Sequence, residues 1–310
     1  MKNVFYIILL LIVFFACNKT NTFNQTTSSS EDSLAIYLSK ANDFSSSQKK
    51  RQEYIQKSFT IIISLPNDSI NRVNLFRVAN RYYNINNWKA YKETVQLVLE
   101  KSVESNDILS TAKAYSYLGD YYDSQGIADS AFLCYFKSEK LYLNLNEKYN
   151  TAKTRLNIAS LQYNESDYLG SEMSVFKALR TIKDVKANDI LYESYNLLGI
   201  VYNELAQYDK AIEYQNKALA IDAKTIPVEF QAKATSLNNL GLVYQNLNKN
   251  KKAISYFQIG LEQNKDLLLY KPSVYAMLLD NLGYSRFKLN EFNGLPGLFY
   301  ESLKLRDSLQ

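Results

Sequence analysis

The chain of 310 residues is 46% hydrophobic and 22% charged, with a formal net charge of +5, which is the composition of a chain that folds around a core rather than staying disordered. It contains no histidine, which excludes histidine-dependent catalytic triads and histidine metal ligands. Only 9 residues are glycine and 4 are proline, so the tight turns that a β-sandwich or barrel needs are scarce.

The N-terminus carries an apolar segment that is short for a membrane span. Twelve apolar residues occupy positions 4–15, whereas a span needs about 20. A secretory leader fits this length better, and Ala16 before Cys17 resembles the lipobox of bacterial lipoproteins, in which the cysteine is lipidated after cleavage, although Phe14 stands where that family usually has Leu. We therefore expect residues 1–16 to be a signal peptide and Cys17 to be the lipidation site. The alternatives are an ordinary cleaved leader and an uncleaved membrane anchor.

A polar stretch follows at residues 17–30. It shows no apolar periodicity, and such a stretch cannot bury enough surface to order itself. We expect a flexible tether between the lipid-bearing cysteine and the folded part of the chain.

The sequence carries no signature of an enzyme or of a nucleic-acid binder. No basic run is interleaved with aromatic residues, and there is no phosphate-binding loop, dinucleotide glycine pattern, paired-cysteine metal motif or zinc-protease helix. The only cysteine besides Cys17 is Cys134, which we expect to be a buried small apolar residue. We therefore predict a protein that is not an enzyme and that needs no cofactor or metal.

From residue 31 onward one pattern recurs every 40 to 42 residues. Its reference positions are small residues, and an apolar residue precedes each of the six. Tyr follows three residues later in four of six cases, a small residue twelve later in four, and Leu twenty later in five. The reference positions are Ala79, Gly119, Ala159, Gly199, Gly241 and Gly283.

This pattern predicts two antiparallel helices in each repeat. The apolar residue and the Tyr are spaced i, i+4, which places them on one helical face. Gly inside a helix costs about 1 kcal/mol relative to Ala, and close approach of the paired helix offsets that cost because no side chain keeps the two backbones apart. Pro66, Pro227 and Pro272 fall at matching positions between repeats, where a helix start tolerates the missing N–H.

The repeat resembles the tetratricopeptide repeat family in its helix-turn-helix unit and its small, Leu and aromatic signature. The resemblance covers residues 31–310, and residues 237–244 (LNNLGLVY) look most like the longer-unit members, such as kinesin light chains and bacterial peptide receptors. It implies an all-α, right-handed α-solenoid of about six to seven helix pairs of 40–42 residues, with a concave groove. The expected units lie near 31–70, 71–107, 108–147, 148–188, 189–227, 228–270 and 271–310.

Three features depart from the family pattern. Arg155, Gln162 and Arg286 occupy expected core positions. Pro296 can be accommodated only in the first turn of a helix. The stack also lacks the polar capping helix that such arrays usually need after their last unit, so we expect that a partner or a second copy covers that end, or that the native chain continues.

In the family, the first helix of each unit lines the groove and binds ligands there. Carboxamides dominate the positions that correspond to this face. Asn196 and Asn238, one unit apart at the same phase, can each pair with the N–H and C=O of an extended peptide, although Asn is abundant throughout and its presence on this face is also explained by composition. The predicted groove residues are Asn80, Tyr83, Asn84, Tyr163, Asn164, Asn196, Asn203, Asn238, Gln245 and Tyr284.

Together these features predict an exported, lipid-anchored scaffold or receptor in a bacterial envelope that binds a peptide or protein segment in its groove. The alternative is the extracytoplasmic sensor half of a membrane-bound transcriptional regulator or kinase whose C-terminal output domain lies outside this sequence. A lesser alternative is a nutrient- or glycan-binding lipoprotein, although no aromatic platform insert interrupts the repeats.

Overall fold

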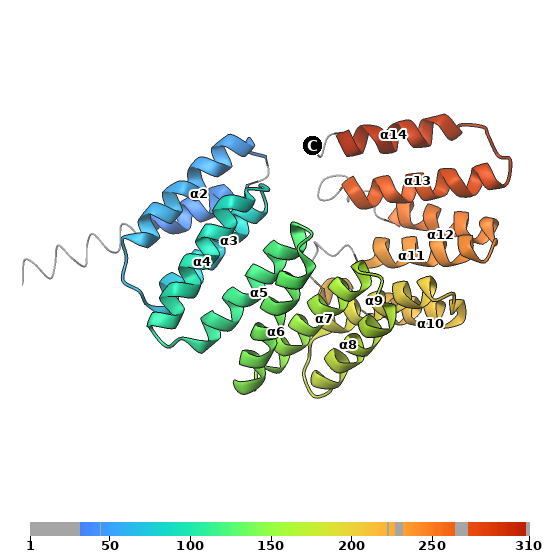
Figure 1. The fold of residues 1–310 in the computed structure, drawn as a ribbon. Helices are drawn as coiled ribbons and strands as arrows, with labels where there is room; N and C mark the ends of the chain where they lie inside the picture. Colours follow the sequence, from blue (N-terminus) through green and yellow to red (C-terminus); the bar gives the residue numbers. More distant parts are fainter. Residues whose placement is uncertain (1–31, 44, 222, 227–231, 264–271, 308–310) are drawn as a thin grey trace, which may run out of the picture. The chain divides into compact units, whose positions relative to one another are not determined.

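A computed structural model describes residues 32–43, 45–221, 223–226, 232–263 and 272–307. Within these ranges every regular element is a helix, and consecutive helices form repeated packed pairs (Figure 1). The expected all-α architecture of helix pairs is thereby confirmed. The expected signal peptide, Cys17 and Pro227 lie outside the described residues.

The chain divides into two compact units, one reaching to Ile127 and the other beginning at Ala128. Unit 1 contains a helix at 32–41, α2 (Gln48–Ile63), α3 (Ser69–Tyr83), α4 (Trp88–Glu104) and α5 (Ile108–Ser124). Unit 2 contains α6 (Ala128–Asn144), α7 (Lys148–Asn164), α8 (Tyr168–Thr181), α9 (Asn188–Glu204), α10 (Tyr208–Leu219), the short 3₁₀ helix η1 (Ala223–Thr225), α11 (Ala232–Asn246), α12 (Asn250–Gln263), α13 (Pro272–Lys288) and α14 (Leu295–Asp307). The division falls inside the repeat expected at 108–147.

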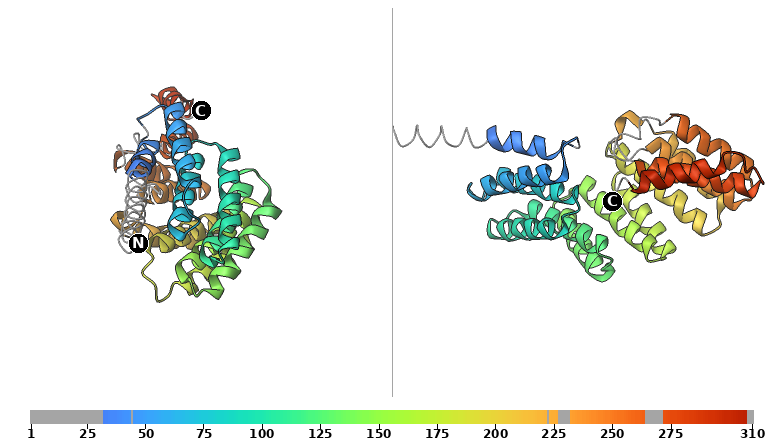
Figure 2. Two further views of the ribbon diagram at one scale, coloured as in Figure 1. Left: turned by 90° about the vertical axis from the view of Figure 1, so that its left-hand side faces the viewer. Right: turned by 90° about the horizontal axis from the view of Figure 1, so that it is seen from above.

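Each unit packs its helices in sequence order. In unit 2, α7 pairs with α8, α9 with α10, α11 with α12 and α13 with α14, and the first helices α7, α9, α11 and α13 also contact one another in that order. In unit 1, α3 contacts both α4 and α5. Figure 2 shows the paired helices of each unit from two further directions. We call the side of α3 and α5 that faces away from their paired helices the first-helix face of unit 1. The corresponding side of α7, α9, α11 and α13 is the first-helix face of unit 2.

The small reference positions lie where paired helices approach each other. A Cβ added at Gly199 would overlap Gln215, and one added at Gly241 would overlap the ring of Phe257, in each case on the paired helix. A side chain of the paired helix therefore fills the space beside each of these glycines, whereas the sequence predicted that the two backbones approach there. The repeated Leu is less uniform, because Leu303 of α14 is 57% exposed.

The polar residues at expected core positions find polar partners. The Arg155 Nε lies 2.6 Å from Oε1 of Glu139, and Ser174 donates a 2.7 Å hydrogen bond to Oε1 of Gln162. Arg286 pairs with a glutamate five residues later at 3.6 Å. These contacts satisfy side chains that would otherwise be costly at an interface between helices.

The prolines within the described ranges lie at helix boundaries. α13 begins at Pro272, and α14 begins one residue before Pro296, which therefore lies in the first turn. Pro66 lies between α2 and α3. Cys134 is buried and forms no disulfide, as expected of a small apolar residue.

The turns between helices pass through a residue with left-handed backbone. Asn is the residue type that, after Gly, adopts this conformation at least cost. The non-glycine residues with positive φ are Asn86, Asn106, Asn146, Ser166, Ala206, Asn248 and Asn290, with φ from 53° to 62°. Gly126 occupies the corresponding turn after α5, with φ of 68°.

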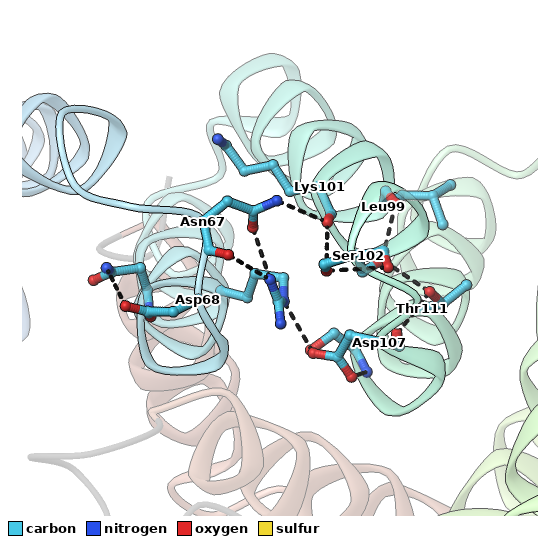
Figure 3. Close-up of polar contacts among 11 residues, drawn as sticks. Asn67, Asp68, Leu99, Lys101, Ser102, Asp107 and Thr111 are labelled. Carbon is cyan, nitrogen blue, oxygen red and sulfur yellow. Dashed lines mark hydrogen bonds and ion pairs between the residues drawn. The ribbon is translucent and has the colours of Figure 1, made fainter.

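An ion-pair network joins α3, α4 and α5 in unit 1 (Figure 3). The Arg72 side chain is 6% exposed, and its Nε donates to Oδ2 of Asp107 at 2.9 Å. Its second nitrogen donates to Oδ1 of Asn67 at 2.7 Å, and Asn67 in turn donates to the carbonyl of Lys101 at 3.0 Å. Burial by itself raises the pKa of Asp107, but hydrogen bonds from Ser110 and Arg72 outweigh it and hold the pKa below its ordinary value.

Candidate binding faces

The first-helix face of unit 1 carries a stripe of polar residues along α3. Arg77, Asn80 and Asn84 are exposed and Arg81 is partly buried, and their spacing of three and four residues places them on one side of the helix. Asn80 forms a side-chain hydrogen bond with Tyr117 of α5. Asn80 and Asn84 thus lie exposed on one side of α3 and its C-terminal cap, and their role in binding stays a prediction.

Tyr83 lies at the end of this stripe and takes part in an aromatic cluster. Its ring is 45% exposed and meets Trp88 edge-on, with ring centroids 5.0 Å apart, and Tyr91 at 5.7 Å. Burial, followed by the charges of Asp120 and Asp123, raises the pKa of Tyr83. Half of this ring is therefore engaged within unit 1, and its other half remains open to solvent.

The first-helix face of unit 2 carries three carboxamide-to-carboxamide hydrogen bonds between neighbouring repeats. Each joins an Asn to the Asn 43 residues later, so the bonds link α9 to α11 and α11 to α13. We call them the carboxamide ladder. They run from Asn239 Nδ2 to Asn196 Oδ1 at 2.8 Å, from Asn246 Nδ2 to Asn203 Oδ1 at 3.0 Å and from Asn281 Nδ2 to Asn238 Oδ1 at 2.8 Å.

Asn238 differs from its expected environment. The sequence places it at the same phase as Asn196, on an open face, but its side chain is only 4% exposed. Its oxygen accepts from Asn281 because α13 packs against α11 at this level. Asn196 is partly buried, and its backbone carbonyl accepts a 3.0 Å bond from Gln215 of the paired helix.

The other predicted residues of unit 2 lie on α7, α11 and α13, and they differ in exposure and in their contacts. Asn164 is exposed, and Tyr163 packs against Tyr168 with ring centroids 5.7 Å apart. The Gln245 Nε2 donates to the backbone carbonyl of Asn281 at 2.9 Å and to the hydroxyl of Ser285 at 2.7 Å. Tyr284 is 47% exposed beneath the ammonium group of a lysine 5.3 Å from its ring.

Two carboxylates lie one turn apart on α9 of the same face. The hydroxyl of Tyr149 of α7 donates to Asp189. Burial raises the pKa of Glu193 to about 7, the charge of Lys153 acts to lower it, and Asp189 acts to raise it. Glu193 therefore changes charge near neutral pH, which an exposed glutamate does not do.

Sequence reasoning missed several of these residues. Asn239 and Asn281 were not assigned to the face, although asparagines separated by one repeat length plus one residue were visible as a signal. Arg77 and Arg81 were missed because neither falls at a position with a repeated residue type. The environment of Glu193 left no signal in the sequence.

Other surface features are sparse within the described ranges. A hollow of about 290 Å³ lies along α8 and the turn after it, lined by Phe176, Leu179, Arg180 and Lys183. In the described part of the chain, no group of three or more Cys, Asp or Glu side chains is arranged to hold a metal ion. None of the described helices is both long enough and apolar enough to cross a membrane.

Comparisons with known proteins agree with this architecture. Residues 193–266 match the family model described as Tetratricopeptide repeat. No curated protein matches the chain in sequence. The family match supports tetratricopeptide repeats over residues 193–266.

Three solved structures share the fold at low sequence identity. BtubC from P. vanneervenii is 19% identical, with 77% of this chain and 94% of that chain covered and a TM-score of 0.56. A signal transduction ATPase with numerous domains from Pyrococcus horikoshii, described as having a tetratricopeptide repeat sensor, is 14% identical, with 84% and 40% covered and a TM-score of 0.61. The apo form of RapI is 15% identical, with 77% and 98% covered and a TM-score of 0.57.

Proposed function

We propose that this chain is a binding protein that holds a peptide or protein segment on the first-helix face of unit 2. The observation that carries the proposal is the carboxamide ladder. A tetratricopeptide scaffold fits such a role because stacked helix pairs present an extended surface rather than a closed pocket.

The bonds of the ladder leave some carboxamide donors and acceptors unused. Each carboxamide offers two N–H donors and an oxygen with two lone pairs, whereas the bond from Asn246 to Asn203 uses one N–H of the first and one lone pair of the second. The amide group of Asn203 and the carbonyl oxygen of Asn246 remain for a ligand. Since each such bond contributes about 0.5 to 1.5 kcal/mol net, an extended peptide needs several of them for stable binding.

Site-specific photocrosslinking in intact cells tests this proposal. Benzoylphenylalanine is placed at Asn203 or at Asn246 on the first-helix face, and at the exposed Lys177 of α8 as the matched control. The proposal predicts that the same partner peptide is captured at the first two positions and not at the control. Equal capture at Lys177, or different peptides at every position, would contradict it.

We further propose that the chain is exported and held at a membrane by lipid on Cys17, as the N-terminal sequence predicts. Labelling with a radioactive or clickable palmitate tests this directly. The wild-type chain is expected to take up label and to fractionate with membranes, and Cys17→Ser is expected to lose both properties. Unlabelled wild-type protein in the soluble fraction would reject the anchor.

We also propose that the chain self-associates through α14. Phe299, Tyr300 and Leu303 are 40%, 71% and 57% exposed on this helix, and a contiguous group of exposed apolar side chains marks a candidate contact surface. Sedimentation equilibrium is expected to show a concentration-dependent dimer that Tyr300→Asp abolishes. A monomer at every concentration would reject the contact.

A further inference from the structure

We infer that Arg77 and Arg81 of α3 form a receptor for the side-chain carboxylates of an acidic peptide segment. The receptor lies in unit 1, so it stands or falls separately from the carboxamide face of unit 2. The inference follows from the positions of the two guanidinium groups, from their hydrogen-bond partners and from the residues beside them.

The two guanidinium groups lack a carboxylate partner within the described ranges. Arg77 donates to Oδ1 of Asn74 at 3.1 Å, and Arg81 donates to the backbone carbonyl of Arg77 at 3.3 Å. The ion pairs found among the described residues involve other arginines and lysines. Both partners of the guanidiniums are neutral, so the positive charges remain uncompensated.

This arrangement opposes the stability of the folded chain. The Nε of Arg81 is buried and has no hydrogen-bond partner, and a buried donor without a partner is unfavourable. Arg77 lies one helical turn away, where like charges repel. Burial, followed by the charge of Arg77, lowers the pKa of Arg81. A bound anion would relieve the repulsion.

The chemistry of the groups points to carboxylates. A guanidinium is a planar fork of N–H donors that matches the two oxygens of a carboxylate. The exposed carboxamides of Asn80 and Asn84 continue the same stripe and can pair with the main chain of an extended peptide. Upstream on the stripe, the 43% exposed side chain of Val73 offers apolar contact.

The neighbouring helix leaves the positive charge in excess. The rings of Phe76 and Tyr117 separate the stripe from Lys113 of α5, whose ammonium group lies 4.7 Å from the first ring centroid and 5.6 Å from the second. The carboxylate that acts on Tyr117 is Asp120. Asp123 acts with Asp120 on Tyr83 at the end of the stripe, so the excess is that of Arg77, Arg81 and Lys113 over these two carboxylates, and a segment with acidic side chains complements this face better than a neutral one.

Fluorescence anisotropy with the full chain tests the receptor. The probe is a labelled, N-acetylated and C-amidated octapeptide of alternating Glu and Ala, and the matched probe has Gln in place of Glu. We expect the Glu peptide to bind at least about tenfold more tightly, with an affinity that falls as salt is raised. The double variant Arg77→Gln, Arg81→Gln is expected to lose this preference, whereas Arg180→Gln, Lys183→Gln on α8 removes the same charge and is expected to keep it.

Three outcomes of the binding measurement would overturn the inference. One is equal binding of the Glu and Gln peptides to the wild-type chain. A second is equal loss in the α3 and α8 variants, which would show a general charge effect. A third is equally tight binding of a Gln peptide with a free C-terminus, which would assign the site to a terminal carboxylate instead.

Thermal unfolding of the α3 variant keeps the test informative. Because the pair is unfavourable in the free chain, Arg77→Gln, Arg81→Gln is expected to melt at the wild-type temperature or above it. A lower melting temperature would show that the pair is structural and would overturn the inference. Photocrosslinking at Asn203 and Asn246 reports on the unit 2 face in the same samples, so failure of one site is distinguishable from failure of the other.

Discussion

Unit 1 and unit 2 are built from the same helix pairs, but they join neighbouring repeats with different polar chemistry. In unit 1 the buried Arg72 links the turn before α3 to the start of α5 through Asp107. In unit 2 neutral Asn side chains link α9 to α11 and α11 to α13, although an ion pair between Arg155 and Glu139 joins α7 to α6. An ion pair is strong only while both groups are charged, whereas a carboxamide bond is insensitive to pH. The repeat therefore fixes how the helices pack, while single residues decide how that packing responds to solution conditions.

The exposed faces of the two units differ in charge as well. The α3 face presents Arg77 and Arg81 without a carboxylate partner, whereas α9 presents Asp189 and Glu193 beside carboxamides. One chain thus offers a cationic surface and a mixed carboxamide and carboxylate surface.

Removal of Arg72 should have the largest effect on this comparison. Arg72→Ala leaves Asp107 partly buried, with 18% of its side chain exposed, and without its charged partner. The expected loss is about 3 kcal/mol in the free energy of unfolding, because breaking a buried ion pair from one side leaves an uncompensated charge. Urea unfolding followed by circular dichroism measures it. In a double-mutant cycle with Asp107→Asn, a coupling near zero would show that the pair does not hold unit 1 together.

The two units should respond to pH in opposite directions. Glu193 has an ordinary pKa of 4.5 and a folded pKa of about 7, so the folded chain holds a proton that the unfolded chain releases between these values. Stability is then lost as pH rises from 4.5 to 7, by about 2 to 3 kcal/mol. Asp107 has a lowered pKa, so its contribution is present above 3.8 and is lost as pH falls through its folded pKa.

Urea unfolding across pH 3 to 8 tests both directions. Glu193→Gln is expected to flatten the curve between pH 4.5 and 7 and to leave the acid limb unchanged. Asp107→Asn is expected to flatten the acid limb alone. If Glu193→Gln leaves the neutral limb as steep as in the wild type, Glu193 is ionised in the folded chain at these pH values.

The carboxamide ladder should contribute according to the burial of each bond. Asn238→Ala leaves the amide of Asn281 without an acceptor at a site only 4% exposed, and we expect a loss of about 1 to 2 kcal/mol. Asn246→Ala removes an exposed bond, which water replaces, so the expected loss is below about 0.5 kcal/mol. Thermal unfolding of the two variants in parallel measures the difference. Equal losses would mean that the ladder does not act through buried hydrogen bonds.

The architecture was predictable from the sequence because it depends on a repeated physical requirement. Each helix pair needs a small residue where the second helix packs a side chain against the first, so Ala79, Gly199 and Gly241 recur at nearly constant spacing and reveal the repeat. The division after Ile127 was not predictable, because residues 108–147 show the same pattern as their neighbours. Periodicity identifies the repeat, but it does not show where the chain divides into compact units.

The binding faces were only partly predictable, because repeat phase identifies a helix face but not burial. Asn196 and Asn238 share a phase, yet Asn238 is covered by α13 and Asn196 is only partly buried. Arg77, which is exposed, and Arg81, which is partly buried, depart from the repeat and therefore left no periodic signal. Residues that recur in every repeat mostly stabilise packing, so residues that occur once are the better candidates for binding a particular ligand. A single sequence does not show which of these residues bind.

The smallest expected effect compares the same turn position in the two units. Unit 1 has Gly126 at φ 68°, with no atom within 4 Å of an added Cβ, and unit 2 has Ala206 at φ 55°. Left-handed backbone costs an alanine about 1 kcal/mol more than a glycine. Ala206→Gly is therefore expected to stabilise the chain by up to about 1 kcal/mol and Gly126→Ala to destabilise it by a similar amount, both read from thermal unfolding. If Ala206→Gly stabilises the chain and Gly126→Ala destabilises it, the two units share one turn geometry. A stabilising Gly126→Ala would mean that the turn after α5 relaxes to a different backbone, which would set the end of unit 1 apart from the turns of unit 2.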